Sequence, residues 1–231
     1  MPPQIRLHSS QVADLAVIRD TPLPTLTAIT EHLRTADPRP MRPEDLHREI
    51  TQVLGADNSD AAKRIMRPLL ALQAIIRQRR LSADEAIEAV RLALQSANPP
   101  WEAAQVERWR QAEPNFKQLL TVPAVRLVSI TLDLMYEHEN LLQSARVVTD
   151  IRPVFSDDAN SIEGSVVSHT LRLRYDSTEG DHSISIAMDE ADIRELERQC
   201  KRALLKARTA AALMRGKAEI QTVISGDGGN A

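Results

Sequence analysis

Three segments in which apolar and polar residues alternate decide the fold. Residues 145–152 read ARVVTDIR, residues 167–175 read VSHTLRLRY and residues 182–188 read HSISIAM. A period of two is typical of β-strands with one covered face, because successive side chains point to opposite faces. A polar loop at 157–164 and a turn at 177–181 separate the segments. The sequence therefore predicts three strands in hairpin order, forming an antiparallel sheet.

The loop between the second and third strands sets their register. If residues 176–181 form this loop, Tyr175 pairs with His182, and His169 lies opposite Met188. This register places the two imidazoles too far apart to share a metal ion. Pro153 lacks an N–H donor, so the first strand is expected to lie at an edge of the sheet or to end nearby.

Residues 1–140 predict an all-helical domain, because their apolar residues recur with the period of a helix. Pro43 suits the first turn of one helix and Gly55 its end. Ser82 and Glu85 form the pattern of a capping box. Pro68 lies inside a long apolar pattern and is expected to kink or split that helix.

The remaining helices are expected over residues 101–112, 123–140 and 189–217. The last begins with Asp189 as its N-cap, with acidic residues early and basic residues late, as the helix dipole favours. Residues 218–231 are rich in Gly and are expected to be disordered. The fold class is therefore α+β: helical residues 1–140, then a three-stranded antiparallel sheet and a long C-terminal helix over residues 141–217.

The charge balance gives little support to a nucleic-acid partner. Lys and Arg number 29 against 32 Asp and Glu, a net charge of −3, and aromatic residues make up 3%. Nucleic-acid-binding domains carry a basic field, and many use aromatic rings on which bases stack.

The compartment is inferred from what the sequence lacks. No apolar run approaches the roughly 18–20 residues that span a bilayer, and residues 1–6 lack the basic stretch and apolar core of a secretory signal. A single cysteine, Cys200, cannot form an internal disulfide. We therefore expect a cytoplasmic protein without a membrane partner. The 24 Arg against 5 Lys favour a GC-rich bacterial genome.

No catalytic, cofactor or metal site is predicted. The chain has no phosphate-binding glycine loop of the P-loop type, no serine nucleophile elbow and no H-E-x-x-H pattern. The cluster at 137–139 is interpreted as a solvated helix end, because adjacent helical residues point in different directions. Asp157, Asp158 and Glu163 are interpreted as parts of a solvated loop. Cys200 lies on an apolar stripe and is expected to pack as a small hydrophobe.

The predicted sheet has two faces, and one helix can cover only one of them. Val148 and Val154 add apolar groups to the face opposite Val147 and Ile151. Exposed apolar surface costs about 25 cal/mol per Å², so the helical half or a second copy is expected to cover it. The predicted dimer or partner interface comprises Val147, Val148, Ile151, Leu171, Leu173, Ile184, Ile186, Leu196 and Leu204.

A basic stripe follows the last helix at intervals of four residues. It consists of Arg194, Arg198, Arg202 and Lys206. The favoured interpretation is a solvated face opposite the apolar stripe; the alternative is contact with an acidic protein surface or with phosphates.

The order of these elements resembles that of the COMM-domain proteins, which carry a helical domain before a C-terminal COMM domain. The resemblance covers residues 142–217, about a third of the chain. The similar pieces are residues 147–153, 170–174, 183–188 and the helix from Ile193 through Leu204. The family usually places a tryptophan in the first strand, where this chain has Val147 and Val148. The resemblance implies dimerisation through interlocked COMM domains and a scaffold or adaptor role without catalysis.

The sequence therefore predicts a non-enzymatic interaction module that forms a homodimer or a higher oligomer. Its other partner is an unidentified protein, in a multi-protein system that it scaffolds or regulates. The alternative is a nucleic-acid-associated regulator that uses the helical domain or the basic stripe. An enzyme with an unrecognised site is the third class.

Overall fold

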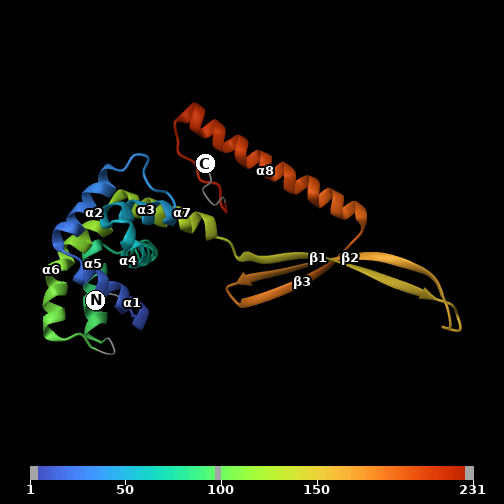
Figure 1. Cartoon of the computed structure of the whole chain (residues 1–231), viewed down its shortest axis with the longest axis horizontal. Coiled ribbons are helices and arrows are strands. Elements are labelled where there is room, and N and C mark those ends of the chain that lie inside the picture. The colour runs from blue at the N-terminus through green and yellow to red at the C-terminus, as the bar shows by residue number, and fades with distance from the viewer. Residues whose placement is uncertain (1–4, 97–99, 227–231) are drawn as a thin grey trace. The chain divides into compact units, whose positions relative to one another are not determined.

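The computed structural model describes residues 5–96 and 100–226. Within these residues, seven α-helices precede three strands and an eighth α-helix, so the fold is α+β as predicted (Figure 1). The chain divides into two compact units, Met1–Leu134 and Met135–Ala231. We call them the helical unit and the sheet unit; the boundary lies in the last turn of the seventh helix.

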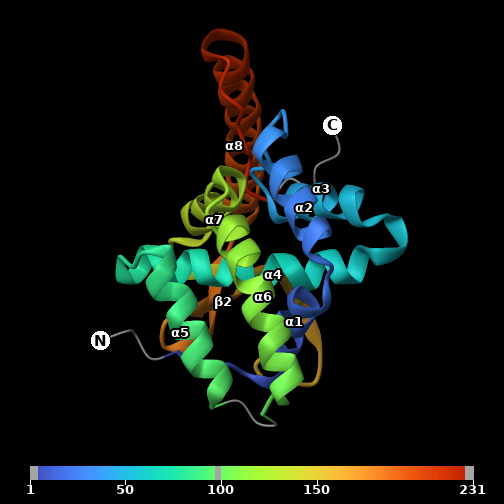
Figure 2. The same cartoon turned by 90° about the vertical axis from the view of Figure 1, so that its left-hand side faces the viewer.

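The helical unit is built from short helices joined by tight connections. Its helices are α1 (Ser9–Asp20), α2 (Leu23–Thr35), α3 (Pro43–Leu54), α4 (Ser59–Arg79), α5 (Ala83–Gln95), α6 (Ala103–Leu120) and α7 (Pro123–Tyr136), with a short 3-10 helix η1 (Ala56–Asn58) after α3. Helix α4 crosses α1, α5 and α6 and contacts each of them (Figure 2).

The predicted start and stop signals are confirmed at α3 and α5. Pro43 occupies the first turn of α3, and Gly55 ends it with a φ of 90°, a conformation that glycine adopts without steric cost. Ser82 Oγ accepts a hydrogen bond from the Glu85 amide at 3.2 Å. The Ser82 amide donates to Glu85 Oε2 at 2.7 Å. This capping box provides acceptors for two backbone N–H groups, those of Ser82 and Glu85, that have no partner within the helix.

Pro68 does not split its helix, so that part of the prediction is wrong. It lies inside the continuous helix α4, between Ile65 and Leu69, which are both fully buried. The proline removes one backbone hydrogen bond. Burial of apolar side chains on both sides of it holds the helix together despite that loss.

The expected ends of two further helices are also wrong. Helix α6 does not end at Ala112 but continues through Pro114 to Leu120, because Phe116 and Leu119 extend its buried stripe. Helix α7 ends at Tyr136 rather than near Asn140, where the first strand begins.

The hydrophobic core of the helical unit gathers side chains from all seven helices. Phe116 is fully buried, and its ring lies 5.6 Å from that of Trp109. The edge-to-face contact between Trp109 and Trp101, at 5.8 Å, extends this cluster. The largest fully buried side chains are Phe116, Leu15, Ile18, Leu26, Ile29, Leu33, Leu46, Ile50, Ile65, Leu69, Leu119 and Leu120.

No single described helix combines the length and the apolar character that crossing a bilayer requires. Helices α6 and α7 meet these criteria only when they are taken together, and a 62° bend separates them.

The sheet unit contains the three predicted strands, β1 (Asn140–Phe155), β2 (Ile162–Ser177) and β3 (Gly180–Met188), followed by α8 (Glu190–Ala218). The strands are antiparallel in the order β1-β2-β3, so β1 is an edge strand. Tyr175 pairs with His182 and His169 with Met188, which confirms the predicted register. Residues 219–226 follow α8 without helix or strand, and residues 227–231 of the predicted tail lie outside the described residues.

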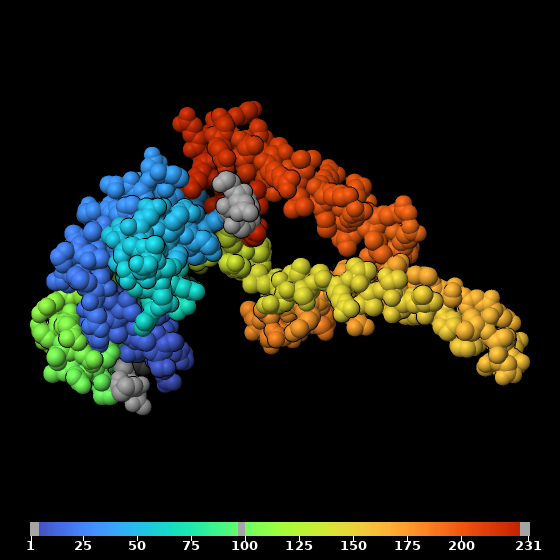
Figure 3. All heavy atoms as spheres, viewed as in Figure 1, coloured from blue at the N-terminus to red at the C-terminus, as the bar shows by residue number. Residues whose placement is uncertain are grey.

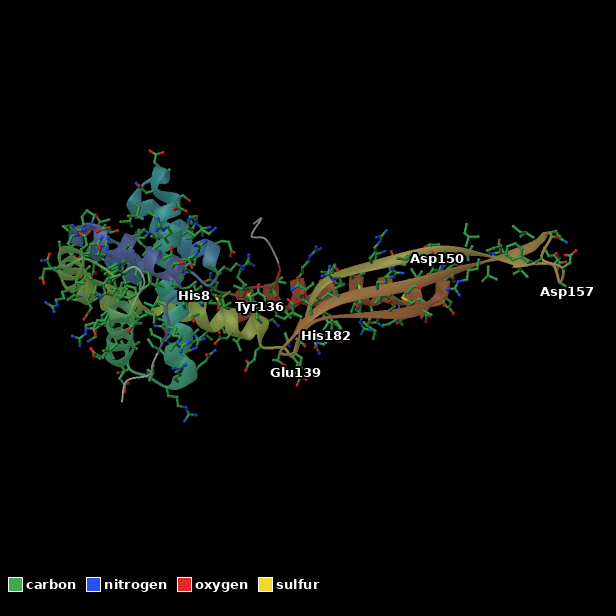
Figure 4. All side chains as sticks on the ribbon, turned by 90° about the horizontal axis from the view of Figure 1, so that it is seen from below. His8, Tyr136, Glu139, Asp150, Asp157 and His182 are labelled. Atoms are coloured by element: carbon green, nitrogen blue, oxygen red, sulfur yellow. The ribbon has the colours of Figure 1, made fainter. Side chains whose placement is uncertain are left out.

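Strand β3 covers only half of β2. It pairs with residues 169–177, so β1 and β2 continue beyond it as a two-stranded ribbon. Figure 4 labels Asp157 at the tip of this hairpin, Asp150 further along it and His182 towards the opposite end of the sheet. An isolated two-stranded ribbon is only marginally stable in water.

We expect Ser82→Ala to lower the free energy of unfolding of the helical unit by about 1 kcal/mol, because the Glu85 amide loses its acceptor. Trp101 and Trp109 are the two tryptophans of the chain and both lie in this unit, so urea unfolding followed by tryptophan fluorescence reports on it. Ser82→Thr keeps the hydroxyl and serves as the control. Equal midpoints for Ser82→Ala and the parent would contradict the capping role.

Candidate interaction surface

The sheet unit has no core of its own. No described residue from Met135 onward is buried, whereas the buried apolar residues of the helical unit range from Leu15 to Val128. In Figure 3, the hairpin ribbon formed by β1 and β2 beyond β3 is a thin arm. A unit of this size normally folds by burying apolar side chains, which offsets the loss of chain entropy.

One face of the sheet is apolar across all three strands. Val147 pairs with Leu171, and Leu171 pairs with Ile186, so these three side chains form a row on the same face. The next row contains Leu173 and Ile184. The apolar face comprises Ala145, Val147, Ile151, Val167, Leu171, Leu173, Ile184, Ile186 and Met188. One polar pair, Thr149 and His169, lies on the same face between the rows of Val147 and Ile151.

Most of the apolar face is open to solvent. The exposed fraction is 71% for Ile151, 45% for Val147 and 42% for Ile186. Leu171 and Leu173, on the central strand, are half-buried by their neighbours. The structure thus brings together six of the predicted interface residues on one face. Large apolar side chains in a contiguous exposed patch are typical of a protein–protein interface.

Helix α8 carries the second part of the predicted interface. None of its residues is buried, and Leu196 and Leu204 are 41% and 60% exposed. Cys200 lies between them on the same side of the helix and is exposed. The expectation that Cys200 packs as a small hydrophobe is therefore wrong within the chain itself, because α8 covers no part of the sheet closely enough to bury it.

The opposite face of the sheet is polar where the three strands overlap. Arg146 pairs with Arg172, and Ser144 pairs with Arg174. Val148 belongs to this face, so the structure separates it from the other predicted interface residues. Val148 and Val154 lie on the face opposite Val147 and Ile151, as predicted, but arginine and serine side chains surround Val148 there. We call this surface the arginine face: Ser144, Arg146, Val148, Thr170, Arg172, Arg174, Ser183, Ser185 and Ala187.

Two of the four cations of the predicted basic stripe form ion pairs with acidic residues of α8 itself. Arg194 forms an ion pair with Glu190, and Arg198 forms one with Glu195 at 2.5 Å. The hydrogen bond from Arg198 lowers the pKa of Glu195 to about 2. Arg202 and Lys206 form no ion pair with any described residue. Arg194 and Arg198 are exposed and already paired within the helix, so they fit the interpretation of the stripe as a solvated face.

Two carboxylates oppose each other near the turn between β2 and β3. Asp176 pairs with Asp181 across the strands, and the Gln143 amide donates a hydrogen bond to Asp176. The hydrogen bond with Asp176, and its negative charge, raise the pKa of Asp181 above the ordinary range. Like charges directly opposite on adjacent strands destabilise a sheet.

The hairpin tip uses its carboxylate to shape the loop. Ser156 Oγ and the Asn160 amide donate hydrogen bonds to Asp158, and these bonds lower the pKa of its carboxyl to about 2. Asp158 therefore stabilises the turn.

The histidines of the sheet make local contacts. His169 Nδ1 lies 2.9 Å from Thr149 Oγ1, and the ring of His182 stacks on Tyr175 with 5.5 Å between centroids. Within residues 5–96 and 100–226, no three His, Cys, Asp or Glu side chains are grouped to hold a metal ion.

The helical unit contains a small cavity between α1 and α4. Its volume is about 300 Å³, and apolar side chains such as Leu15, Leu72 and Ile75 form much of its lining. The Asp14 carboxylate at its edge is held by Arg64 at 3.2 Å and by Arg67 at 3.6 Å. This carboxylate is engaged in ion pairs, which leaves it poorly placed to act as a general base.

Neither the protein-family models nor the curated proteins include a match to this chain.

Sequence reasoning missed the arginine face as a surface. The signal was present, because Arg146, Arg172 and Arg174 occupy alternate positions of their strands. Only the register between β1 and β2 brings Arg146 beside Arg172, and irregularities between Leu142 and Ser144 and between Val154 and Phe155 bound the stretch that has this register.

We expect Leu173→Asp to destabilise the fold and Arg172→Asp to leave it nearly unchanged, although the two residues are neighbours. Leu173 lies on the apolar face, so a carboxylate there would cost roughly 2 kcal/mol or more when that face is covered. Arg172 is exposed on the other face, so its replacement should leave folding nearly intact. Thermal melting and sizing of both variants would test this. A parent-like Leu173→Asp beside a collapsed Arg172→Asp would reverse the assigned faces.

We expect Asp181→Asn to stabilise the β2–β3 hairpin at pH 7 but not near pH 3. The raised pKa means that the folded hairpin favours the protonated carboxyl, so the unfavourable repulsion develops as pH rises through that pKa. Hydrogen exchange of β3 at the two pH values measures the difference. Glu179→Gln in the same turn changes the charge equally and is the control. Equal slowing by both variants at pH 7 would contradict a specific effect of the Asp176–Asp181 pair.

Proposed function

We propose that the protein is a non-enzymatic interaction module that forms a homodimer through its sheet unit. The observation that carries this proposal is the lack of any buried described residue after Leu134, in a unit with a contiguous apolar face and an apolar stripe on α8. A second copy supplies both complementary parts at once. The partner's α8 would cover the apolar face, and the partner's apolar face would receive this chain's α8.

Such an exchange satisfies the symmetry of a two-fold dimer, in which the same surfaces meet from both sides. The 29 residues of α8 correspond to a length of about 43 Å. The 16 residues of β2 extend over about 54 Å, so the helix fits along the central strand. Each large apolar side chain that becomes buried would contribute about 1.5–3 kcal/mol, and the two-fold axis doubles every contact.

The helical unit would then be free to contact other proteins. Its core is complete within the chain, so it needs no partner for its own fold. Together with the resemblance of residues 142–217 to COMM-domain proteins, this division supports a scaffold or regulator of a bacterial multi-protein system. The cytoplasm is the compartment that we propose, because a single cysteine provides no internal disulfide.

The nucleic-acid alternative has weaker support. Its predicted basic stripe loses Arg194 and Arg198 to ion pairs within α8. Phosphate contacts depend on unpaired cations. Of the stripe, only Arg202 and Lys206 form no ion pair with a described residue.

We expect the protein to have twice its chain mass of 25.7 kDa in light scattering at micromolar concentration. Ile186→Asp, on the apolar face, should abolish the dimer because it places a carboxylate in the covered surface. Leu92→Asp in α5 is the matched control, because Leu92 is 41% and Ile186 42% exposed in the single chain. The control should remain dimeric. A wild-type protein with the mass of a single chain would overturn the proposal.

The exposed thiol of Cys200 gives a second measurement that does not depend on a variant. Because Cys200 lies on the apolar stripe of α8, dimerisation should protect it from a maleimide reagent. The labelling rate should therefore fall as protein concentration rises. A rate that is independent of concentration, together with a dimeric mass, would place α8 outside the interface.

A further inference from the structure

The arginine face concentrates cations and hydroxyls in a small area. Arg174 lies between Ser144 and Ser183, in a row that crosses the three strands. In the next row, Arg172 lies between Arg146 and Ser185. The three guanidinium groups thus occupy adjacent positions of two neighbouring strands, with serine hydroxyls on both sides.

Arg146, Arg172 and Arg174 are exposed, and no salt bridge joins any of them to a described residue. Arg174 lies close enough to Asp181 for its positive charge to lower the pKa of that carboxyl, against the larger opposite effect of Asp176. Arg146 and Arg172 have no such acidic neighbour among the described residues. The pairing of Arg146 with Arg172 places like charges directly opposite each other, which destabilises a sheet unless an anion lies between them. Arg194, Arg198 and Lys201 of α8, by contrast, have acidic partners on their own helix.

We infer that the arginine face binds a short acidic segment of another protein, with Arg146, Arg172 and Arg174 contacting its carboxylates. Guanidinium groups bind carboxylates through paired N–H donors, and the serine hydroxyls supply further donors. Neighbouring strands are about 4.8 Å apart, and alternate residues of one strand about 7 Å. Acidic side chains three or four residues apart on a helix, about 5–6 Å, match this spacing.

The surroundings of the patch select against a long polyanion. Asp150 lies beyond one end of it, and Asp176 with Asp181 lies beyond the other. A nucleic-acid backbone that ran along the strands would meet these carboxylates at both ends of the patch. The arginine face contains no aromatic residue on which bases could stack. A segment with two or three carboxylates fits between the acidic ends.

This inference rests on the proposed function in one respect: the second copy covers the apolar face and leaves the arginine face accessible. Different measurements test the proposed dimer and the proposed peptide site. The mass of the protein reports on the dimer, whereas peptide binding reports on the arginine face.

The experiment uses the full chain and a fluorescein-labelled peptide of glutamate residues, with binding followed by fluorescence anisotropy at low salt. The test variant is Arg146→Gln/Arg172→Gln. The control is Arg208→Gln/Arg215→Gln, which removes the same charge from exposed positions of α8. We expect the test variant to weaken peptide binding by about tenfold or more, which corresponds to about 1.4 kcal/mol, and the control to change it by less than about twofold. Light scattering should show both variants with the wild-type mass.

Three outcomes would overturn the inference. In the first, both variants weaken peptide binding equally, which would indicate unspecific attraction. In the second, the wild-type protein does not bind the peptide. In the third, the wild-type protein binds a labelled DNA duplex more tightly than the peptide. A wild-type protein that is monomeric in light scattering but binds the peptide would overturn the proposed dimer alone.

Discussion

The pleat of the central strand is the constraint on which the sheet unit depends. Because successive residues of β2 point to opposite sides, Leu171 and Leu173 are separated from Arg172 and Arg174 by the thickness of one backbone. A shift of one residue would exchange every one of these side chains. The turn at Gly180, with a φ of 114°, fixes the register against β3. Two surfaces of different chemistry therefore follow from one alternating sequence.

The two units satisfy the hydrophobic effect in different ways. The helical unit buries Phe116, Leu26 and Ile65 completely, so its side chains provide its stability. Strand pairing satisfies the backbone groups that lie between the strands of the sheet unit, but its apolar side chains remain open to solvent. Backbone hydrogen bonds contribute modestly to net stability, since the unfolded chain forms similar bonds with water. The sheet unit thus lacks, among its described residues, the buried apolar contacts that stabilise the helical unit.

Local signals in the sequence were sufficient for the order of the elements and for the register between β2 and β3. Ser82 with Glu85, Asp189 and Gly55 each act through neighbours within a few residues, and each has its predicted role in the structure. The length of α6 and the continuity of α4 through Pro68 were mispredicted, because burial against distant helices decides them. The candidate site was predicted in part. Alternation identified the apolar face, but the grouping of the arginines depends on a pairing between strands more than 20 residues apart.

The free edge of β1 has a consequence for how the molecule avoids unwanted assembly. An edge strand exposes a row of N–H and C=O groups that can template fibre growth by addition of further strands. Pro153 removes one N–H donor from this row, because proline has no backbone N–H. Proline is tolerated in a strand where its nitrogen faces away from the paired strand. Asp150 and Arg152 place charges beside it. Pro153 and these charges therefore hinder the addition of further strands along β1, which is the route to amyloid.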